Sequence, residues 1–376
     1  REPVGGPVGL TLALLLARRG MASVVFDART VEQARGDQRL LALSRGSLQT
    51  LSVFTELPSN AVAPIRTVIV SSAGEFGRAV IDDSELGAEI LGVTIRYGDL
   101  VAALSVAAEA SPLITLRRPL KVTAVRQSPS HVDIDLEHHQ TVKAPLALSA
   151  EGFGHGPIAS ASHAALVADL DIAGIESGQA YERFTRDGPL ALLPLPVQGP
   201  LASLRWSLVW CMTQAQAERR GMLGDQEFIG ELSAQLGEGK LRVVAVHSRK
   251  RHPLHQQMRD AVVEHRVVYL GNAAQTLHPV AGQGLNLGLR DAAVLAEKIS
   301  DAYVSGTDAI QALASYAQSR RMDRAAIVAL TRAAPSFFST RFAPIALVRS
   351  IGLTALGVVP NLRRDFARLL MFGVRF

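Results

Sequence analysis

Hydrophobic and polar positions at the start of the chain follow the pattern of a β-α-β unit without its first strand. Residues 5–20 place a glycine turn before a run of leucine and alanine, and this predicts a helix. Residues 22–27 are β-branched and end in an acid, which predicts a short strand. Residues 1–3 are too few for a preceding strand and include a proline. We therefore expect residues to be missing before Gly5, and also within 30–38.

The rest of the chain mixes helical periodicity with alternating strand patterns. Alternating segments at 121–126, 131–136 and 141–148 predict an antiparallel meander, and a buried strand at 267–270 leads into a glycine-rich loop. Further strands are predicted at 67–70, 78–82, 181–184, 190–195 and 204–212, and helices at 39–51, 97–110, 225–236, 291–305 and 307–329. Because parallel and antiparallel patterns occur together, we predict an α/β fold in which a second, sheet-based domain interrupts a nucleotide-binding domain.

Composition and charge narrow the class of protein. The 376 residues are 48% hydrophobic and 19% charged, which excludes a disordered chain, and the single Cys211 excludes a disulfide scaffold. The histidines show no metal-ligand spacing, so we expect no metal. Residues 331–376 hold seven arginines and one acid, hence 7 − 1 = +6, while the whole chain carries +5. This segment lacks lysine and is rich in aliphatic residues, so we expect no nucleic acid as a partner.

The first candidate site is the turn Gly6-Pro7-Val8-Gly9 together with Asp27. A glycine turn lets the main chain approach a pyrophosphate, whose charge is met by amide groups at the start of the helix. An acid at the end of the following strand can accept hydrogen bonds from the adenosine ribose. Because Val4 stands where the dinucleotide fingerprint has its first glycine, a glycine-rich turn before a core helix is the alternative.

The second candidate site is the glycine-rich segment 268–291. A buried strand delivers the polar Asn272, and a helix begins near Gly282 and Gly284. Free amides at a helix start stabilise negative charge on a bound ring, and glycine lets a flat ligand lie against the main chain. A purely structural turn would not explain so many polar and glycine residues between two apolar elements.

The run 271–284, Gly-Asn-Ala-Ala-Gln-Thr-Leu-His-Pro-Val-Ala-Gly-Gln-Gly, resembles the flavin-binding signature of aromatic-ring FAD-dependent monooxygenases, a group that includes para-hydroxybenzoate hydroxylase. Most of that family has Asp at the position of Asn272 and often His at that of Gln275. The Asn and Gln resemble the ubiquinone-biosynthesis hydroxylase branch, and within it the 2-polyprenyl-6-methoxyphenol hydroxylases most closely. Segments 182–194 and 207–211 also resemble the substrate domain of that branch.

This resemblance implies an α/β fold of the para-hydroxybenzoate hydroxylase type. Residues 1–72, 91–165 and 259–330 would form a discontinuous Rossmann-like FAD-binding domain. Residues 73–90 and 166–258 would form a mixed-sheet substrate domain, followed by a basic amphipathic helical segment at 331–376.

The resemblance also implies roles for individual residues. The turn at 6–9 would hold the FAD pyrophosphate, Asp27 the adenosine ribose and Arg39 the phosphates, while Val122 would lie beside the adenine. Asn272 would take the place of the ribityl-contacting Asp of the family. The other residues expected to contact the flavin or phosphates are Pro279, Gly282, Gln283, Gly284, Leu285 and Asn286. We assign no role to Glu151, because Glu151-Gly152 matches the Asp-Gly element of the family poorly.

In this family, FAD reduced by NAD(P)H reacts with O₂ and one oxygen atom is transferred to a phenol ring. We expect an apolar pocket that excludes water, and the alternative is that the same side chains are ordinary sheet core. Its candidate lining residues, on alternating strand positions, are Phe184, Leu190, Leu192, Pro194 and Trp210. His278 is the candidate general base, with a structural role in the loop as the alternative.

The implied substrate is a polyprenylated methoxyphenol of ubiquinone biosynthesis, which dissolves in a bilayer. We therefore expect a cytoplasmic protein, peripheral to the inner membrane, that contacts lipid through 337–376. A helical cap on the FAD-binding domain, or an interface with other ubiquinone-pathway proteins, is the alternative for this segment. Alternative functions are a sibling hydroxylase acting at another ring position, a non-catalytic flavin-binding assembly subunit, and a flavin reductase or dehydrogenase. Ring position, prenyl length, the choice between NADH and NADPH and the oligomeric state do not follow from the sequence.

Overall fold

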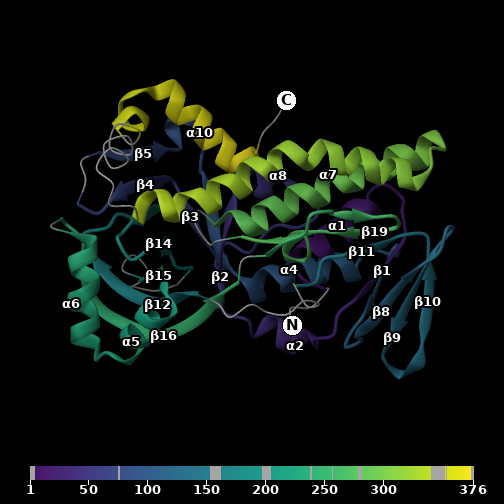
Figure 1. The fold of residues 1–376 in the computed structure, drawn as a ribbon, viewed down its shortest axis with the longest axis horizontal. Coiled ribbons are helices and arrows are strands. Elements are labelled where there is room, and N and C mark those ends of the chain that lie inside the picture. The colour runs from purple at the N-terminus through teal and green to yellow at the C-terminus, as the bar shows by residue number, and fades with distance from the viewer. Residues whose placement is uncertain are drawn as a thin grey trace.

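The computed structural model describes residues 5–74, 77–152, 162–196, 205–237, 239–255, 257–277, 282–339, 352 and 354–373. Figure 1 shows a large sheet with two helices at one end of the molecule and a small meander at the other end. The long helices α7 (Gln283–Ser305) and α8 (Ala309–Ser339) run along one side between the two ends.

Two pairs of parallel strands form the centre of the part that carries the glycine motifs. β1 (Ser23–Phe26) pairs with β7 (Ile114–Arg117), and β11 (Ala147–Ser149) pairs with β19 (Val267–Tyr269). The helices α1 (Pro7–Ala17) and α4 (Tyr97–Glu109) pack against each other and against the β1–β7 pair. Nearly every side chain of α1 is buried, as expected for a helix that is apolar on all sides.

Smaller elements surround this centre. β2 (Leu40–Ser44), β6 (Gly92–Arg96) and β3 (Val62–Ile65) form one antiparallel sheet, and β10 (Thr141–Ala144), β9 (Val132–Leu136) and β8 (Val122–Gln127) form the meander. The remaining short elements are α2 (Val31–Arg35), α3 (Arg45–Leu51), β17 (Gln257–Met258), β18 (Val263–Glu264) and β20 (Gln275–Thr276).

A cavity of about 910 Å³ separates the two parallel strand pairs. β1 and β11 line it together with α1. Within the described residues, β1 pairs only with β7, and β11 pairs only with β19. Each of these two strands, β1 and β11, therefore has one edge without a partner strand. The cavity therefore combines apolar walls with two open strand edges, which are the features that would accept one more strand of a β-α-β unit.

The large sheet has the strand order β16-β12-β15-β14-β13-β4-β5. Neighbouring strands are antiparallel except for β13 and β4. Its strands are β4 (Thr67–Ser72), β5 (Arg78–Asp82), β12 (His163–Ala173), β13 (Gln179–Phe184), β14 (Pro189–Pro194), β15 (Arg205–Thr213) and β16 (Arg242–Leu254).

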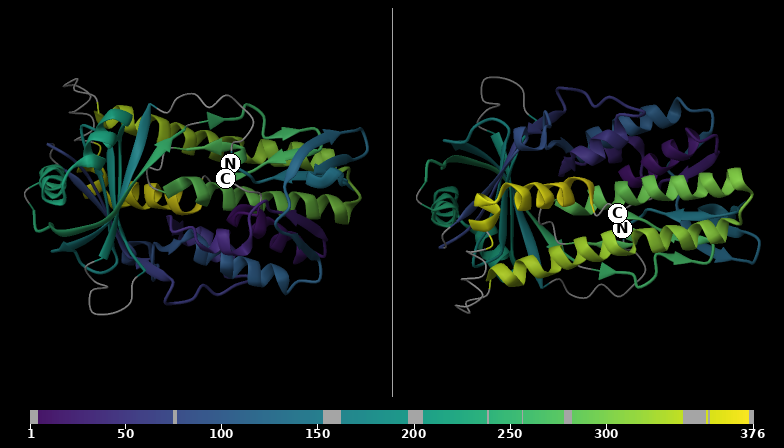
Figure 2. Two further views of the ribbon diagram at one scale, coloured as in Figure 1. Left: turned by 90° about the horizontal axis from the view of Figure 1, so that it is seen from below. Right: turned by 90° about the horizontal axis from the view of Figure 1, so that it is seen from above.

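The two faces of the large sheet meet different surroundings. The helices α5 (Gln214–Met222) and α6 (Asp225–Leu236) cover the face that is turned away from α7 and α8 (Figure 2). A core of fully buried side chains lies between this face and the helices. The other face is turned toward the glycine motifs, because Asp169 of β12 forms an ion pair at 3.4 Å with Arg96 of β6.

The C-terminal helix α10 (Pro360–Phe372) packs on the molecule through one side. Ala367 and Met371 join a core cluster with side chains of β3, β5 and β13. Arg363 donates to both carboxylate oxygens of Glu85 at 2.6 and 2.7 Å. Through these contacts α10 covers β5 and β13 of the large sheet as well as β3, while Leu362, Val358 and Val359 remain exposed.

Most predicted elements are present, with two informative differences. The helix predicted at 39–51 is wrong at its start, because 40–44 pairs with β6 as a strand and only 45–51 is helical. The strand predicted at 141–148 is two strands, β10 and β11, which belong to different sheets. The long strands β12 and β16 carry no corresponding prediction.

Candidate cofactor site

The two glycine motifs predicted from the sequence meet at Val8. A Cβ atom added to Gly288 of α7 would lie 2.8 Å from Val8 Cγ2 and 3.1 Å from the Cα of Gly271. Contacts this short leave room for hydrogen only, so glycine is required for the start of α1, the turn after β19 and the first part of α7 to come together. Segments more than 260 residues apart thus form one junction.

Both helices at this junction begin with glycine. Gly6 is the N-cap of α1 and Pro7 its first residue, and Gly282 is the N-cap of α7 in the left-handed conformation with φ = +59°. No side chain among the described residues caps either helix. The first amide groups of a helix have no partner within the helix and carry partial positive charge. The junction therefore offers two sets of amide donors to an anionic or electron-rich ligand.

Asp27 follows β1 and lies at the same end of the sheet as the glycine turn. Its side chain is fully buried, and its Oδ1 accepts from the backbone N–H of Arg29 at 3.0 Å. Its Oδ2 has no hydrogen-bond partner among the described residues, and the nearest cation is Arg118 Nε at 3.7 Å. A Cβ on Gly5 would lie 2.2 Å from this oxygen, so the glycine turn passes directly over the carboxylate.

Asn286, in the first turns of α7, forms four hydrogen bonds within the protein. Its Nδ2 donates to the carbonyl oxygens of Ala42 and Gly282 at 2.9 and 2.8 Å. Its Oδ1 accepts from the backbone N–H of Ser44 at 2.8 Å and from the hydroxyl of Ser47 at 2.7 Å. An asparagine side chain has two donors and two acceptor sites, so this set uses its capacity fully. In the structure the amide of Asn286 joins α7 to β2 and α3.

Arg39 lies before β2, beside an aromatic ring. Its guanidinium donates to both carboxylate oxygens of Asp37 and lies 4.7 Å from the centroid of the Tyr97 ring. Arg29 donates to the hydroxyl of Tyr97 at 3.1 Å. Although burial alone would raise the pKa of Asp37, the hydrogen bonds from Arg39 outweigh it and hold that pKa below its ordinary value. Arg29 and Arg39 thus both lie against the Tyr97 ring near Asp27, with the charge of Arg39 balanced by Asp37.

The other cofactor-binding residues predicted from the sequence lie on several elements. Gln283 is buried at the start of α7, and a Cβ on Gly284 would meet nothing within 4 Å, so this glycine borders open space. Asn272 and Leu285 are half-buried, and Val122 lines the cavity between β1 and β11. His278 and Pro279 lie outside the described residues.

A buried ion network connects α8 to Gln275 and Asp291, which precede and follow the glycine-rich loop in the sequence. Arg320 of α8 donates to Asp291 at 2.7 Å and to Asp323 at 2.5 Å. Arg324 donates to Gln275 Oε1 at 2.8 Å, which anchors the strand that precedes the loop. Burial alone would lower the pKa of Arg320, but the carboxylates of Asp291 and Asp323 raise it, so the guanidinium stays charged. The sequence pattern did not indicate this network, since its partners come from different elements.

The side chains predicted to line the substrate pocket lie on different faces of the large sheet. Leu190, Leu192 and Trp210 belong to the core between this sheet and α6, where Trp210 packs against Phe228. For these three residues the ordinary-core alternative is correct. Phe184 is buried on the opposite face, because side chains alternate along β13 and Tyr181 packs into the helix-covered core.

Pro194 shares its register position with Trp206 of β15, which is part of the same core. Its carbonyl oxygen accepts from the Thr94 hydroxyl at 2.5 Å, so the end of β14 is tied to β6. The structure therefore does not bring the five predicted lining residues together.

The face turned toward the glycine motifs carries polar groups that the sequence analysis missed. His247 Nε2 lies 3.0 Å from Asp171 Oδ2, and Arg205 Nε lies 2.6 Å from Asp171 Oδ1. Asp169 on the same face pairs with Arg96. The signal was available, since Asp169 and Asp171 alternate with apolar residues along 166–172 as on a strand with one polar face.

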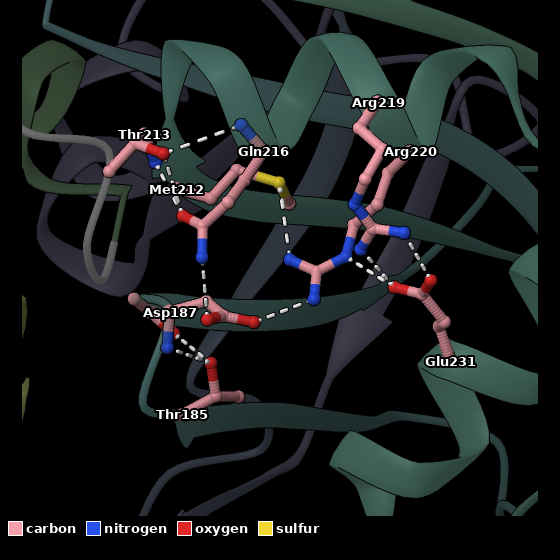
Figure 3. A network of polar contacts seen from close by, with 9 residues as sticks. Thr185, Asp187, Met212, Thr213, Gln216, Arg219, Arg220 and Glu231 are labelled. Carbon is pink, nitrogen blue, oxygen red and sulfur yellow. Dashed lines mark hydrogen bonds and ion pairs between the residues drawn. The ribbon is translucent and has the colours of Figure 1, made fainter.

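A polar network fixes α5 and α6 on the other face (Figure 3). Arg220 is almost fully buried over the Trp210 ring, 4.1 Å from its centroid, and donates to Asp187 and Glu231 at 2.7 and 2.9 Å. Arg219 donates to both oxygens of Glu231. Arg220 also donates to the sulfur of Met212, and Gln216 donates to Asp187, so these groups satisfy one another and the network serves the packing of the helices.

Two further findings concern metal binding and membrane-spanning helices in the described residues. Among these residues, no cluster of three or more His, Cys, Asp or Glu side chains could hold a metal ion. None of the described helices combines the length and the hydropathy that are needed to cross a membrane.

Comparison with known proteins agrees with a flavin site. The family model described as FAD binding domain matches residues 4–331. The chain is 32% identical over 384 residues to the ubiquinone hydroxylase UbiL of Rhodospirillum rubrum, a match that covers 98% of this chain and 88% of that protein. It is 27% identical to the 3-demethoxyubiquinol 3-hydroxylase of Escherichia coli, covering 96% of this chain and 95% of that protein.

Solved structures share the fold. The p-nitrophenol 4-monooxygenase PnpA of Pseudomonas putida superposes with a TM-score of 0.73 at 17% identity, covering 99% of this chain and 97% of that chain. HpxO of Klebsiella pneumoniae, in complex with FAD, gives a TM-score of 0.69 at 15% identity, with 96% of each chain covered. The chain therefore shares the overall arrangement of its sheets and long helices with these two proteins.

Proposed function

The chain belongs to the family of FAD-binding monooxygenases, and from this premise we propose that it hydroxylates the ring of a polyprenylated methoxyphenol in ubiquinone biosynthesis. It is an aromatic hydroxylase that uses FAD, with NAD(P)H and O₂ as co-substrates. The proposal of this substrate class is supported by relatives named as ubiquinone hydroxylase and 3-demethoxyubiquinol 3-hydroxylase. The structural observation that carries it is the junction at Val8, where the two glycine motifs meet.

The residues at this junction fit an FAD. A dinucleotide needs donors for its pyrophosphate, an acceptor for its ribose and a flat surface for its ring. The uncapped start of α1 offers the donors, the buried Asp27 Oδ2 is an acceptor without a partner among the described residues, and the glycines at 282 and 284 leave main chain exposed. When bound, FAD supplies the activation of O₂ and the transfer of oxygen to the ring.

In this proposal the protein binds FAD and the phenol, orients them and excludes water from the site. Residues 1–72, 91–165 and 259–330 hold FAD, and residues 73–90 and 166–258 hold the phenol. Amides at the start of α7 stabilise negative charge on the flavin ring. His278 and the His247–Asp171 pair are candidates to accept the phenol proton, since a positioned imidazole can act as a general base.

The register of the large sheet suggests a revised pocket lining. Phe184, Ala191 and Val209 occupy one face of adjacent strands, because Ala191 pairs with both Glu182 and Val209, and Glu182 and Phe184 share a face of β13. Leu193 follows Ala191 on the same face. This face is turned toward the glycine motifs, but Leu193 packs against the cluster that α10 covers, so we assign Phe184, Ala191 and Val209 to the substrate pocket in place of Leu190, Leu192 and Trp210.

Three measurements on the purified protein test the proposal. A flavin absorption spectrum, oxidation of NAD(P)H stimulated by prenylated methoxyphenols, and ¹⁸O in the product from ¹⁸O₂ are the expected results, and mass spectrometry of that product gives the ring position. A colourless protein that takes up no FAD would overturn the proposal. A yellow protein without stimulated oxidation would indicate an assembly subunit, and product without ¹⁸O would indicate a dehydrogenase.

We infer that the same protein acts in the cytoplasm at the face of the inner membrane, where such a substrate dissolves. The outer side of α10 and the residues before it expose Val358, Val359 and Leu362 beside Arg364 and Arg368. Exposed aliphatic groups next to arginine suit an anionic lipid surface.

Flotation with phosphatidylglycerol vesicles tests this contact. The combined variant Leu362→Asp, Arg364→Glu and Arg368→Glu should bind less than the parent chain. Val244→Asp, which changes an exposed valine on β16, should float as the parent does. Equal flotation of the parent and the triple variant would contradict lipid contact through this helix and leave the cap as the role of α10.

A further inference from the structure

A buried arginine beside Asp27 is not explained by the packing of the protein. β1 and β7 pair in parallel with Phe26 opposite Arg117, so Asp27 and Arg118 are the next residues of the two strands. Two backbone hydrogen bonds fix this end of the pair, from Asp27 N–H to Arg117 O at 3.1 Å and from Leu120 N–H to Asp27 O at 2.8 Å. The carboxyl ends of adjacent parallel strands are where α/β proteins bind ligands.

The two side chains are almost completely removed from solvent without satisfying each other. The side chain of Asp27 is 0% exposed and that of Arg118 is 6% exposed. Arg118 Nε lies 3.7 Å from Asp27 Oδ2, which is beyond hydrogen-bond distance. Asp27 Oδ2 and the Nε and Nη2 of Arg118 have no hydrogen-bond partner among the described residues. Such groups are rare in native proteins and indicate a missing partner.

The guanidinium is held in place from its far side. Arg118 Nη1 donates to the Ser105 hydroxyl at 3.0 Å, and that hydroxyl donates to Val101 O at 2.7 Å. Ser105 is itself buried in α4. One nitrogen is therefore fixed by the protein, while an acceptor and two donors remain unused around the Asp27 carboxylate.

An alcohol fits this set, because a hydroxyl donates one hydrogen bond and accepts others. We propose that Arg118 is a second ligand of the adenosine ribose of FAD, donating to a ribose hydroxyl that itself donates to Asp27. This proposal rests on the FAD binding proposed above and assigns to Arg118 a contact with the ribose half of the cofactor. Because the contact involves a charged donor, its loss should weaken FAD binding about tenfold.

Ligand titrations on flavin-depleted protein test this assignment. Arg118→Gln should bind FAD and ADP about tenfold more weakly than the parent, and bind FMN, which lacks adenosine, equally well. The parent should prefer ADP to 2′,3′-dideoxy-ADP, and Arg118→Gln should lose most of this preference. Arg117→Gln removes the same charge from an exposed neighbour and should behave as the parent.

The outcomes separate a ribose contact from a structural role. If Arg118→Gln binds ADP and its dideoxy analogue in the same ratio as the parent, Arg118 only neutralises Asp27 and the inference is overturned. If Arg118→Gln does not fold, Arg118→Lys replaces it in the test, because lysine keeps the charge. An Arg118→Lys protein with the melting temperature of the parent should still show a reduced preference for ADP over 2′,3′-dideoxy-ADP. A parent chain that binds no FAD would refute the proposed function itself, and the ribose contact with it.

Discussion

The Ser47 hydroxyl donates to Asn286 Oδ1 at 2.7 Å, and both side chains are almost fully buried. This bond connects α3 to the first turns of α7 across 239 residues of sequence. The same amide holds Ser44 and Ala42 of β2. Asn286 therefore sets the distance between β2 and the uncapped start of α7, whose amides we propose to face the flavin ring.

Asn286→Ala should loosen the cofactor site. Four hydrogen bonds are lost, and the half-buried Ser44 N–H and the buried Ser47 hydroxyl lose their acceptor, so we expect a loss of about 2–4 kcal/mol in the free energy of unfolding. FAD affinity should fall at least tenfold, because the start of α7 is no longer held against β2. Denaturant unfolding and FAD titration measure the two effects.

Asn361→Ala provides the matched control, because Asn361 is exposed on α10. It should leave both unfolding and FAD affinity as in the parent. Parent-like stability and FAD affinity in Asn286→Ala would show that its four hydrogen bonds do not position the site.

Gly288→Ala should separate the two glycine motifs. The added Cβ would lie 2.8 Å from Val8 Cγ2 and 3.1 Å from Gly271 Cα, so α1 and α7 must move apart at a cost of about 1–3 kcal/mol. FAD affinity should fall with stability, and the second substitution Val8→Ala should restore part of both. Calorimetry and FAD titration follow the series.

Gly230→Ala is the control for the change of residue type alone. A Cβ at this position of α6 would meet nothing within 4 Å, so alanine should stabilise the helix by up to about 1 kcal/mol. A Gly288→Ala protein that melts and binds FAD as the parent does would mean that the junction at Val8 is more open than the structure shows.

Some parts of the candidate site could be predicted from the sequence, because they depend on residue types within one short segment. The glycine turn, Asp27 and the helix start at Gly282 are recognisable from residue types that only a few backbone conformations accept. The helix predicted at 225–236 is confirmed at the same bounds, because its apolar face and flanking glycines are local signals.

Other parts depend on tertiary partners that a single sequence does not reveal. Alternation along β14 and β15 separates two faces, but it does not tell which face α6 covers and which is turned toward the glycine motifs, so Leu190 and Trp210 could not be assigned to a face. Residues 40–44 are a strand because β6 pairs with them. Arg118 was missed because its role depends on Asp27 in a neighbouring strand.

Acid should weaken the packing of α5 and α6 on the large sheet. The hydrogen bond from Arg219, with a further one from Arg220, lowers the pKa of Glu231 from its ordinary value to about 2. A carboxylate with a lowered pKa stabilises the folded state above its unfolded pKa, and this contribution is lost as the pH falls toward 2. Since Glu231 is 31% exposed, solvent screening limits the contribution to about 1–2 kcal/mol.

Glu231→Gln should remove this contribution at pH 7. It should also flatten the dependence of unfolding free energy on pH between about 5 and 2, as followed by urea unfolding at several pH values. Glu297→Gln changes an exposed carboxylate on α7 and should leave the dependence unchanged. A Glu231→Gln protein with the parent pH profile would contradict the assigned ion pair.

Filling the cavity between β1 and β11 should stabilise the nucleotide-binding part. A variant with five valine and isoleucine residues directly before Gly5 would place an extended segment at the entrance to this cavity of about 910 Å³, between two strands with open edges. Each buried aliphatic side chain contributes about 1.5–3 kcal/mol, and ordering each residue costs about 1–2 kcal/mol. The expected net gain in unfolding free energy is therefore about 2–5 kcal/mol.

Hydrogen exchange locates the effect. If the added segment pairs with both open edges, amides of Ser23–Phe26 and Ala147–Ser149 should exchange more slowly, while those of α6 should change little. An extension of equal length made of glycine and serine should give neither the protection nor the gain, because it buries no aliphatic surface. Equal melting temperatures for the two extensions would mean that the cavity does not accept a strand, and that the two parallel pairs close on each other instead.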